Sequence, residues 1–427
     1  MKRLLQSILA SLARGILRRY QPKVVAVTGS VGKTSAKEAI ALVLGKKFLV
    51  RKSGKNYNNE IGVPLTVIGI DSGNRNPFAW FSIIAKAWAL THGPKKEYPE
   101  VLVMELGADH PGDIRFLTNL VSPEIGVVTA VGPVHLEFFS TIEKVANEKG
   151  ELIKGLPQKG WAILNADDDL VVPMKEASNA QKLTYGFGEK ADVRLTDITV
   201  VYDTLPPHWP KGMRGKIIHA GNVVPVAFPG IIGRHQLYSP MAAVAVGLSM
   251  GMHLIEITKS LSEYRSPAGR MNLIPGIKKT MLIDDSYNSS PVAAEEALET
   301  IQHIQSKGSK YAALGDMAEL GQYTETGHEE VGVVASHSVD FIITVGEKSR
   351  TIAQAALSQG FPKDRVFRFD YAQEAGKFLQ HRIKPGDILL IKGSQVARME
   401  KVTKELMAEP LRATQLLVRQ SPKWLKK

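Results

Sequence analysis

The stretch that most constrains this chain covers residues 24–35 and reads Val-Val-Ala-Val-Thr-Gly-Ser-Val-Gly-Lys-Thr-Ser. An apolar run ends in two glycines, a lysine and two hydroxyls, and a helical pattern starts at Ala36. This order is typical of a strand, a phosphate loop and a helix N-terminus, where backbone N–H groups converge on phosphate oxygens. We therefore expect Lys33 to reach the outer phosphates of a nucleotide and the Thr34 hydroxyl to bind Mg²⁺.

The loop is a shortened variant, because the standard spacing asks for a glycine where this chain has Val27. A plain glycine turn after a buried strand is the alternative, and the Gly-Lys-Thr-Ser order disfavours it. The residues expected to surround the phosphates are Thr28, Gly29, Ser30, Val31, Gly32, Lys33, Thr34 and Ser35.

Composition narrows the class of protein further. The 427 residues suffice for two or three domains with sizeable cores. Cysteine is absent, which excludes disulfides and thiolate metal sites and fits a reducing compartment. The net charge of +12 suits nucleic acid, anionic lipid or a phosphorylated substrate. Because the sequence carries no DNA- or RNA-binding signature, we expect no nucleic acid. Because export would separate the loop from ATP, we expect a cytoplasmic protein. No apolar run is long enough to predict a spanning helix. We also expect a monomer.

Apolar runs and amphipathic periods alternate along the chain, which predicts an α/β fold with mostly parallel sheets. The first set of strands is expected at 24–28, 101–105, 125–130 and 161–165, with helices at 34–44, 112–120 and 141–155. Residues 192–228 lose the helical period and predict short strands and loops, before helices at 236–250 and 254–264. After a linker at 266–269, strands are expected at 280–284, 311–315, 341–345 and 387–391, with helices at 291–305, 325–337, 349–359, 371–381 and 396–407.

The first residues do not follow this alternation. Residues 3–19 predict an amphipathic helix whose apolar face holds Leu4, Leu5, Ile8, Leu9, Leu12 and Ile16. The domain organisation expected from these patterns is an N-terminal helix at 1–21, a central nucleotide-binding domain at 22–266, a smaller Rossmann-like domain at 267–410 and a basic, poorly patterned tail at 411–427.

Polar residues near the strand ends are candidates for chemistry. Glu105 ends a buried strand beside the phosphate loop, where it suits a metal ligand, an ion pair or a turn. His135 follows the next strand and could complete a metal shell or be structural. Lys149 lies on a predicted helix, where composition alone favours a solvated surface lysine. The polar run 165–169 suits either a ligand contact or a turn.

Ten short motifs, taken together, resemble the Mur ligases in their order and context over roughly residues 22–407. They are the segments 28–35, 56–64, 105–108, 135–137, 149–151, 165–167, 269–270, 284–288, 315–321 and 392–394. The last three point to the members that add D-alanyl-D-alanine.

This resemblance implies an ATP-dependent amide ligase that joins D-alanyl-D-alanine to a muramoyl tripeptide in cell-wall precursor synthesis. In this family a substrate carboxylate attacks the γ-phosphate, and an amine then attacks the acyl phosphate and releases phosphate. The resemblance also implies a P-loop central domain and a C-terminal Rossmann-like domain.

The resemblance assigns roles by position. Lys33, Glu105, His135, Lys149 and Arg270 would be catalytic, with Mg²⁺ held by Thr34, Glu105, His135 and Lys149. Lys149 matches a lysine that the family carbamylates, which reverses the interpretation from composition. Gln236 and Asp285 would contact the nucleotide, and Arg270 matches the linker arginine that reaches its γ-phosphate from the domain junction. The peptide substrates would meet Asn58, Asn59, Asn288, Asp316, Met317, Glu319 and Lys392.

The chain also departs from the family pattern. Only about 22 residues precede the first core strand, where the family carries a UDP-gripping domain, so the carrier of the acceptor stays open. Gln236 and Ser239 replace two adenine-facing asparagines, and Gln236 can still donate and accept. Gln395 replaces an arginine, whose charge Arg398 could supply.

An apolar, aromatic segment at 77–92 has two interpretations. It packs against the N-terminal helix, or it forms with residues 3–19 a peripheral contact with the inner face of the membrane, suited to a lipid-linked acceptor. Two alternative functions also stay open: a ligase of similar chemistry with another acceptor, such as a folate, and a non-catalytic ATP-binding subunit.

Overall fold

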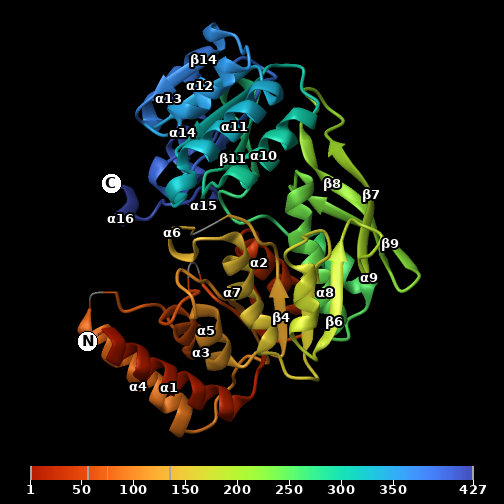
Figure 1. The fold of residues 1–427 in the computed structure, drawn as a ribbon, viewed down its shortest axis with the longest axis vertical. Coiled ribbons are helices and arrows are strands. Elements are labelled where there is room, and N and C mark those ends of the chain that lie inside the picture. The colour runs from red at the N-terminus through yellow and green to blue at the C-terminus, as the bar shows by residue number, and fades with distance from the viewer. Residues whose placement is uncertain (1, 55–56, 75, 134–135, 426–427) are drawn as a thin grey trace.

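The computed structural model describes residues 2–54, 57–74, 76–133 and 136–425. Two sheets, each with helices on both faces, lie one above the other (Figure 1), so the predicted α/β class is confirmed. In the part of the chain described, no helix is long and apolar enough to cross a bilayer. The predicted domain limits stay predictions.

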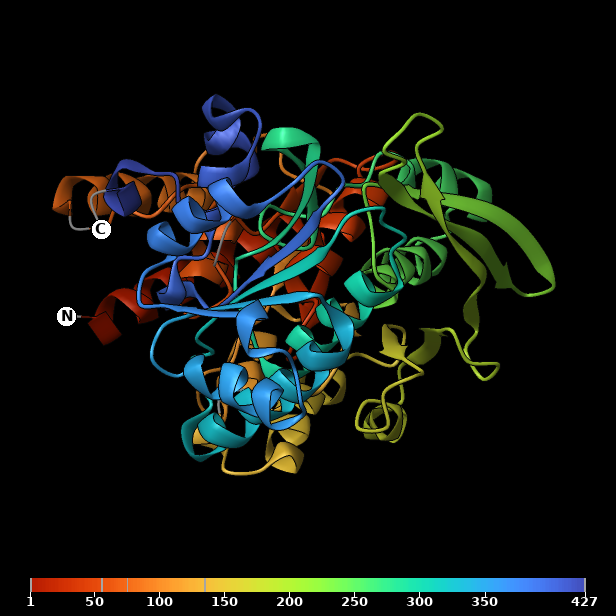
Figure 2. The same ribbon diagram turned by 90° about the horizontal axis from the view of Figure 1, so that it is seen from above.

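The larger sheet is parallel at one side and antiparallel at the other. Its strand order is β2-β3-β1-β4-β5-β6-β7-β8-β9, parallel as far as β7 and antiparallel from β7 to β9. The antiparallel strands project to one side of the molecule in both views (Figure 1, Figure 2). The strands are β1 (Lys23–Thr28), β2 (Val50–Lys52), β3 (Val101–Glu105), β4 (Ile125–Val128), β5 (Trp161–Asn165), β6 (Gln181–Gly186), β7 (Val193–Tyr202), β8 (Pro210–His219) and β9 (Asn222–Pro229).

Strand β1 lies between β3 and β4 in the parallel part of the sheet and is buried on both faces. Val25 and Val27 enter one apolar cluster, and Val24 and Ala26 enter the other, as the alternation of a strand requires. On the first face lie α2 (Lys33–Leu44), α8 (Tyr238–Ser249) and α9 (Leu254–Leu261). On the second lie α1 (Lys2–Tyr20), α3 (Gly62–Ile68), α4 (Pro77–His92), α5 (Asp113–Val121), α6 (Leu136–Phe139) and α7 (Ile142–Lys154).

The smaller sheet has the order β10-β11-β15-β12-β13-β14, parallel except for the β10–β11 pair. Its strands are β10 (Asn272–Gly276), β11 (Thr280–Asp285), β12 (Lys310–Gly315), β13 (Phe341–Val345), β14 (Val366–Phe369) and β15 (Ile388–Lys392). Its helices are α10 (Pro291–His303), α11 (Thr324–Ser338), α12 (Arg350–Ser358), α13 (Ala372–Arg382) and α14 (Glu400–Leu406). The short elements β2, β6, β10, β14 and α3 had no sequence prediction, because three to seven residues give too little periodicity.

The predicted apolar face of the first helix was partly wrong. Leu9, Ala13 and Ile16 are fully buried between α1 and the sheet, but Leu4 is 66% exposed and Ile8 is 36% exposed. The α1 and α4 helices lie side by side in both views (Figure 1, Figure 2). The small residues of α1 allow this close approach, since Gly15 faces Thr91 of α4 and a Cβ there would collide with it.

The tail has more structure than its composition predicted. After α14 it forms the short helices α15 (Ala413–Leu416) and α16 (Pro422–Leu425). Ala413 and Leu417 are buried in the apolar cluster on one face of the smaller sheet. Because this packing depends on partners far away in the sequence, no local pattern announced it.

Docking of α1 gives a stability prediction. Leu9→Ala removes a fully buried side chain and should lower the free energy of unfolding by about 2–5 kcal/mol. The matched control Leu4→Ala truncates an exposed leucine of the same helix and should change it by less than about 0.5 kcal/mol. Urea unfolding followed by tryptophan fluorescence measures both, and equal midpoints for Leu9→Ala and wild type would show that α1 is not docked.

Candidate active site

The phosphate loop lies at the carboxyl edge of the larger sheet, between β1 and α2. Gly29 and Gly32 have φ angles of 146° and 80°, which other residues adopt only with strain. A Cβ on Gly29 would collide with the Thr129 hydroxyl, and that hydroxyl donates to Val31 O at 2.5 Å. Ser30 N also donates to Ala130 O at 2.7 Å. The loop after β4 therefore braces the phosphate loop.

Three further loop residues hold this geometry. Thr28 Oγ1 donates to Leu106 O at 2.9 Å, which ties the end of β1 to the segment after β3. Lys33 Nζ folds back over the loop and donates to Gly29 O at 2.7 Å and to Ser30 O at 3.2 Å. Burial lowers the pKa of Lys33, Glu105 opposes this shift, and the charge of Arg270 adds to it. Ser35 is buried, and its carbonyl accepts from Tyr264 Oη at 3.1 Å.

Glu105 lies beside the start of α2 and binds two other predicted residues. Its Oε2 accepts from Thr34 Oγ1 at 2.9 Å, and its Oε1 accepts from Asn58 Nδ2 at 3.2 Å. A carboxylate, a hydroxyl and an amide oxygen are hard donors of the kind that Mg²⁺ prefers. Thr34 and Glu105 therefore fit the predicted metal site in chemistry and in place.

Lys37 belongs to the same group and was not predicted from the sequence. Its side chain is 1% exposed, with Nζ 3.9 Å from Glu105 Oε2 and 2.9 Å from Ser53 O. Its position one helical turn after Lys33 was the available signal, since residues four apart share a helix face.

Lys149 is buried on α7, so the interpretation as a solvated surface lysine was wrong. Burial first and the charge of Lys33 second lower its pKa to about 7, against the opposing charges of Glu148, Asp109 and Asp113. Glu148 holds the start of α5, because its carboxylate accepts from Gly112 N at 2.8 Å and Ile114 N at 2.7 Å. A buried lysine near the phosphate lysine is thus built into the site.

Most of the other predicted residues at this edge shape the loops and turns around it. His135, predicted as a metal ligand, lies outside the described residues. Asn165 Nδ2 donates to Thr129 O at 3.0 Å, and Asp168 Oδ2 accepts from Val131 N at 2.8 Å, so the 165–169 run orders the loops. Asn59 Oδ1 accepts from Gly62 N at 3.0 Å and caps the start of α3.

Arg270 lies on the segment that joins the two sheets. Its guanidinium carbon is 4.3 Å from the centre of the Tyr287 ring, a cation–π contact. The charge of Arg270 acts on the pKa of Lys33, so the linker arginine and the phosphate lysine share one electrostatic environment.

Asp285, Asn288 and Lys392 meet at the carboxyl edge of the smaller sheet. Lys392 Nζ is 2.5 Å from Asp285 Oδ2 and donates to Asn288 O at 3.2 Å. Asp285 Oδ1 accepts from Met271 N at 3.2 Å, which anchors the linker. The structure thus brings three predicted residues together beside Arg270.

The segment around Gln236 faces this group from the larger sheet. Burial lowers the pKa of the neighbouring His235 to about 4, with Asp285 and Lys392 as the charges that act on it. Gln236 N donates to Gly233 O at 3.1 Å, and Ser239 is buried. Tyr238 Oη donates to Asp167 Oδ2 at 3.1 Å.

The third group, at the end of β12, is held within the C-terminal lobe. Asp316 Oδ1 accepts from Ser349 N at 2.7 Å, and its carbonyl accepts from Ser394 N at 3.0 Å. Met317 is buried, and its N–H donates to His328 Nε2 at 3.0 Å, so its side chain supports the loop. Glu319 is exposed, with φ of 65°.

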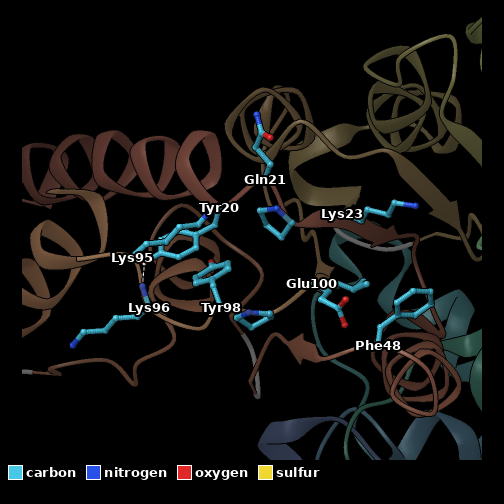
Figure 3. Close-up of a pocket in the computed structure, with 11 residues that line it drawn as sticks. Tyr20, Gln21, Lys23, Phe48, Lys95, Lys96, Tyr98 and Glu100 are labelled. Atoms are coloured by element: carbon cyan, nitrogen blue, oxygen red, sulfur yellow. Dashed lines mark hydrogen bonds between the residues drawn. The ribbon is translucent and has the colours of Figure 1, made fainter. Parts of the chain in front are cut away.

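A cavity of about 400 Å³ lies elsewhere, at the amino ends of β1 and β3 (Figure 3). Tyr20 and Tyr98 stack there with ring centres 4.5 Å apart, beside Lys95 and Lys96. Because β1 runs from this cavity to the phosphate loop, its length separates the two.

Comparison with known proteins agrees with this geometry. The Mur ligase middle domain model matches residues 27–76 and 88–247, and the Mur ligase, glutamate ligase domain model matches residues 269–395. The UDP-N-acetylmuramoyl-tripeptide–D-alanyl-D-alanine ligase of Bacillus subtilis is 31% identical over 404 residues, which cover 94% of this chain and 80% of that protein. The Escherichia coli ligase of the same name is 29% identical over 92% of this chain and 79% of that protein.

A solved structure is similar over the same extent. The MurF ligase of Thermotoga maritima, in complex with ADP, superimposes with a TM-score of 0.77 at 28% identity, over 94% of this chain and 83% of that one. The predicted resemblance is thereby confirmed, and the chain belongs to the Mur ligase family.

Proposed function

We propose that this protein is an ATP-dependent amide ligase that joins D-alanyl-D-alanine to a muramoyl tripeptide and acts as a monomer. The single observation that carries the proposal is the buried Lys149 beside Lys33, at the edge where Thr34 and Glu105 meet. Nucleotide binding by the phosphate loop needs no buried lysine on α7. The relatives that match more than nine tenths of this chain, and about four fifths of their own length, bear the name of this activity.

The arrangement suits a reaction between anions. The tripeptide carboxylate attacks the γ-phosphorus and ADP leaves; the amine of D-alanyl-D-alanine then attacks the acyl carbon, phosphate leaves and the amine proton is released. Lys33 and Arg270 bring positive charge to the phosphates, which would otherwise repel the carboxylate. Mg²⁺ bound at Thr34 and Glu105 would add charge neutralisation at the phosphates.

Lys149 is suited to carry a carbamate. Carbon dioxide reacts with the neutral amine, and a lysine with a pKa of about 7 is about half neutral near pH 7, whereas a solvated lysine is almost fully protonated there. The reaction forms an N–C bond and releases one proton, which turns the side chain into an anion with two oxygens. That anion would bind Mg²⁺ and relieve the repulsion between Lys149 and Lys33.

Substrate requirements test the proposed ligation. Phosphate release from ATP should require both D-alanyl-D-alanine and a muramoyl tripeptide, with the amide product found by mass spectrometry. Release with glutamate and a folate instead would identify a ligase with another acceptor. Nucleotide binding without any release would identify a non-catalytic subunit, and either result overturns the proposal.

Removal of the Lys149 side chain tests its part in the reaction. Lys149→Ala should lower kcat at least about 100-fold, and added bicarbonate should not restore it. The control Lys154→Ala removes a half-exposed lysine of the same helix and should leave kcat within about twofold.

The pH dependence supplies a further readout of the same lysine. Below pH 7 the amine gains its proton, so only about one tenth stays neutral one pH unit lower and wild-type activity should fall. Dissolved carbon dioxide in excess should recover part of that loss in the wild type and none in Lys149→Ala. Full activity of Lys149→Ala would overturn the carbamate.

The α1–α4 pair also presents an apolar surface, for which we propose the anionic inner face of the membrane as the partner. The α4 helix packs on α1 through Ile83 and Ala87, which agrees with the packing interpretation of residues 77–92. It still leaves Phe78 86%, Phe81 75% and Trp88 59% exposed. Exposed Arg14 and Arg18 on α1 add positive charge that suits anionic headgroups.

Flotation with vesicles tests this surface. The wild type should float with phosphatidylglycerol-containing vesicles and not with pure phosphatidylcholine. Phe78→Ser/Phe81→Ser should lower the bound fraction at least about tenfold, since each ring buries apolar area in the interface. Ile255→Ser, an exposed apolar residue of α9, is the matched control. A wild type that stays unbound in both cases would contradict the membrane contact.

A further inference from the structure

The C-terminal tail reaches the linker side of the candidate site. Beyond α15, Leu417 is buried in the core of the smaller lobe, and Val418 lies against Gly269 of the linker. The next residue, Arg419, has a φ of 59°, a left-handed backbone conformation that interrupts any regular helix or strand. Val418, which lies beyond the residues matched by the family models, thus contacts Gly269, the residue directly before Arg270.

Arg419 binds the turn that follows β11. One guanidinium nitrogen donates to Ser286 O at 2.9 Å, and the other donates to Tyr287 O. The planar guanidinium presents its donors in a rigid fork, so two of its nitrogens bind the two neighbouring carbonyls in a fixed direction. The side chain is 5% exposed, so these bonds are largely shielded from water.

The charge of Arg419 is balanced within the lobe. Its Nη1 is 3.3 Å from an oxygen of Glu400, which is 1% exposed. The other Glu400 oxygen accepts from Arg398 Nε at 2.6 Å. The Arg398 guanidinium also lies 5.2 Å from the Trp424 ring and donates to Trp424 O at 3.2 Å. Arg398 is therefore engaged in fastening the tail.

The turn that Arg419 holds carries the support of Arg270. The Tyr287 ring contacts the Arg270 guanidinium, and Tyr287 N donates to Gly269 O at 3.1 Å. On the opposite side, Asp285 accepts from Met271 N. Hydrogen bonds therefore join the linker to the turn at both neighbours of Arg270, which are Gly269 and Met271. Arg419 holds the same turn through its backbone carbonyls.

We propose that Arg419 is a positioning residue, which holds the Ser286–Tyr287 turn so that the Tyr287 ring keeps Arg270 aimed at the γ-phosphate of the nucleotide. This inference rests on the proposed role of Arg270. Because the Arg419 side chain is almost fully buried against the turn and Glu400, its effect on ligands should pass through Arg270.

Nucleotide affinities separate this role from a structural one. Arg419→Ala should weaken binding of a non-hydrolysable ATP analogue roughly tenfold, as expected for loss of one charge-assisted contact, while ADP binds within about twofold of wild type. Arg419→Lys keeps a cation beside Glu400, so its affinity for the ATP analogue should lie between those of the wild type and Arg419→Ala. The control Arg412→Ala removes a half-exposed tail arginine paired with Glu409 and should change neither affinity. Calorimetry with the full chain measures all of these without any ligation.

A double-mutant cycle then tests the route. If Arg419 acts through Arg270, Arg270→Ala/Arg419→Ala should bind the analogue no more weakly than Arg270→Ala alone. Additive losses, or equal losses for ADP and the analogue in Arg419→Ala and Arg419→Lys, would overturn the proposal, as would unchanged affinities. Because binding needs no acceptor peptide, failure of the proposed ligation leaves this test intact.

Discussion

The parallel pairing of β3, β1 and β4 governs the rest of the structure. In this register Val27 lies opposite Glu105, and Thr28 lies opposite Val128. Neighbouring strands are about 4.8 Å apart, so the chain must deliver the phosphate loop, the carboxylate and the bracing loop to one edge. Their mutual hydrogen bonds follow from that register, and a shift by one residue would turn Glu105 to the other face.

Positive charge dominates this edge. Lys33 and Lys37 lie near the buried carboxylate Glu105. Burial lowers the pKa values of Lys33 and Lys149, and the neighbouring cations, Arg270 for Lys33 and Lys33 for Lys149, lower them as well. Such a group of cations is costly without a counter-anion and is stabilised when a polyanion binds. A nucleoside triphosphate supplies that charge, and a carbamate on Lys149 would remove one of the cations.

The second lobe contributes through a few tightly anchored segments. The linker at Arg270, the turn after β11 and the end of β15 meet around Asp285 and Lys392. The tail fastens this group from outside the sheet, through Arg419 and Glu400. The electrostatic reach of Arg270 to Lys33 connects this lobe with the phosphate loop.

The sequence by itself determined the elements whose pattern is local. The phosphate loop, the buried strands before Glu105 and Asp285 and the long helices follow from apolar periodicity and glycine positions, which encode backbone conformation directly. Only the tertiary structure decided that Lys149 is buried, that Ala13 rather than Leu4 faces the core, and that the tail carries Arg419 to the linker. Burial of these residues depends on partners tens to hundreds of positions away, because packing and electrostatics act through space and leave no mark on the neighbouring sequence.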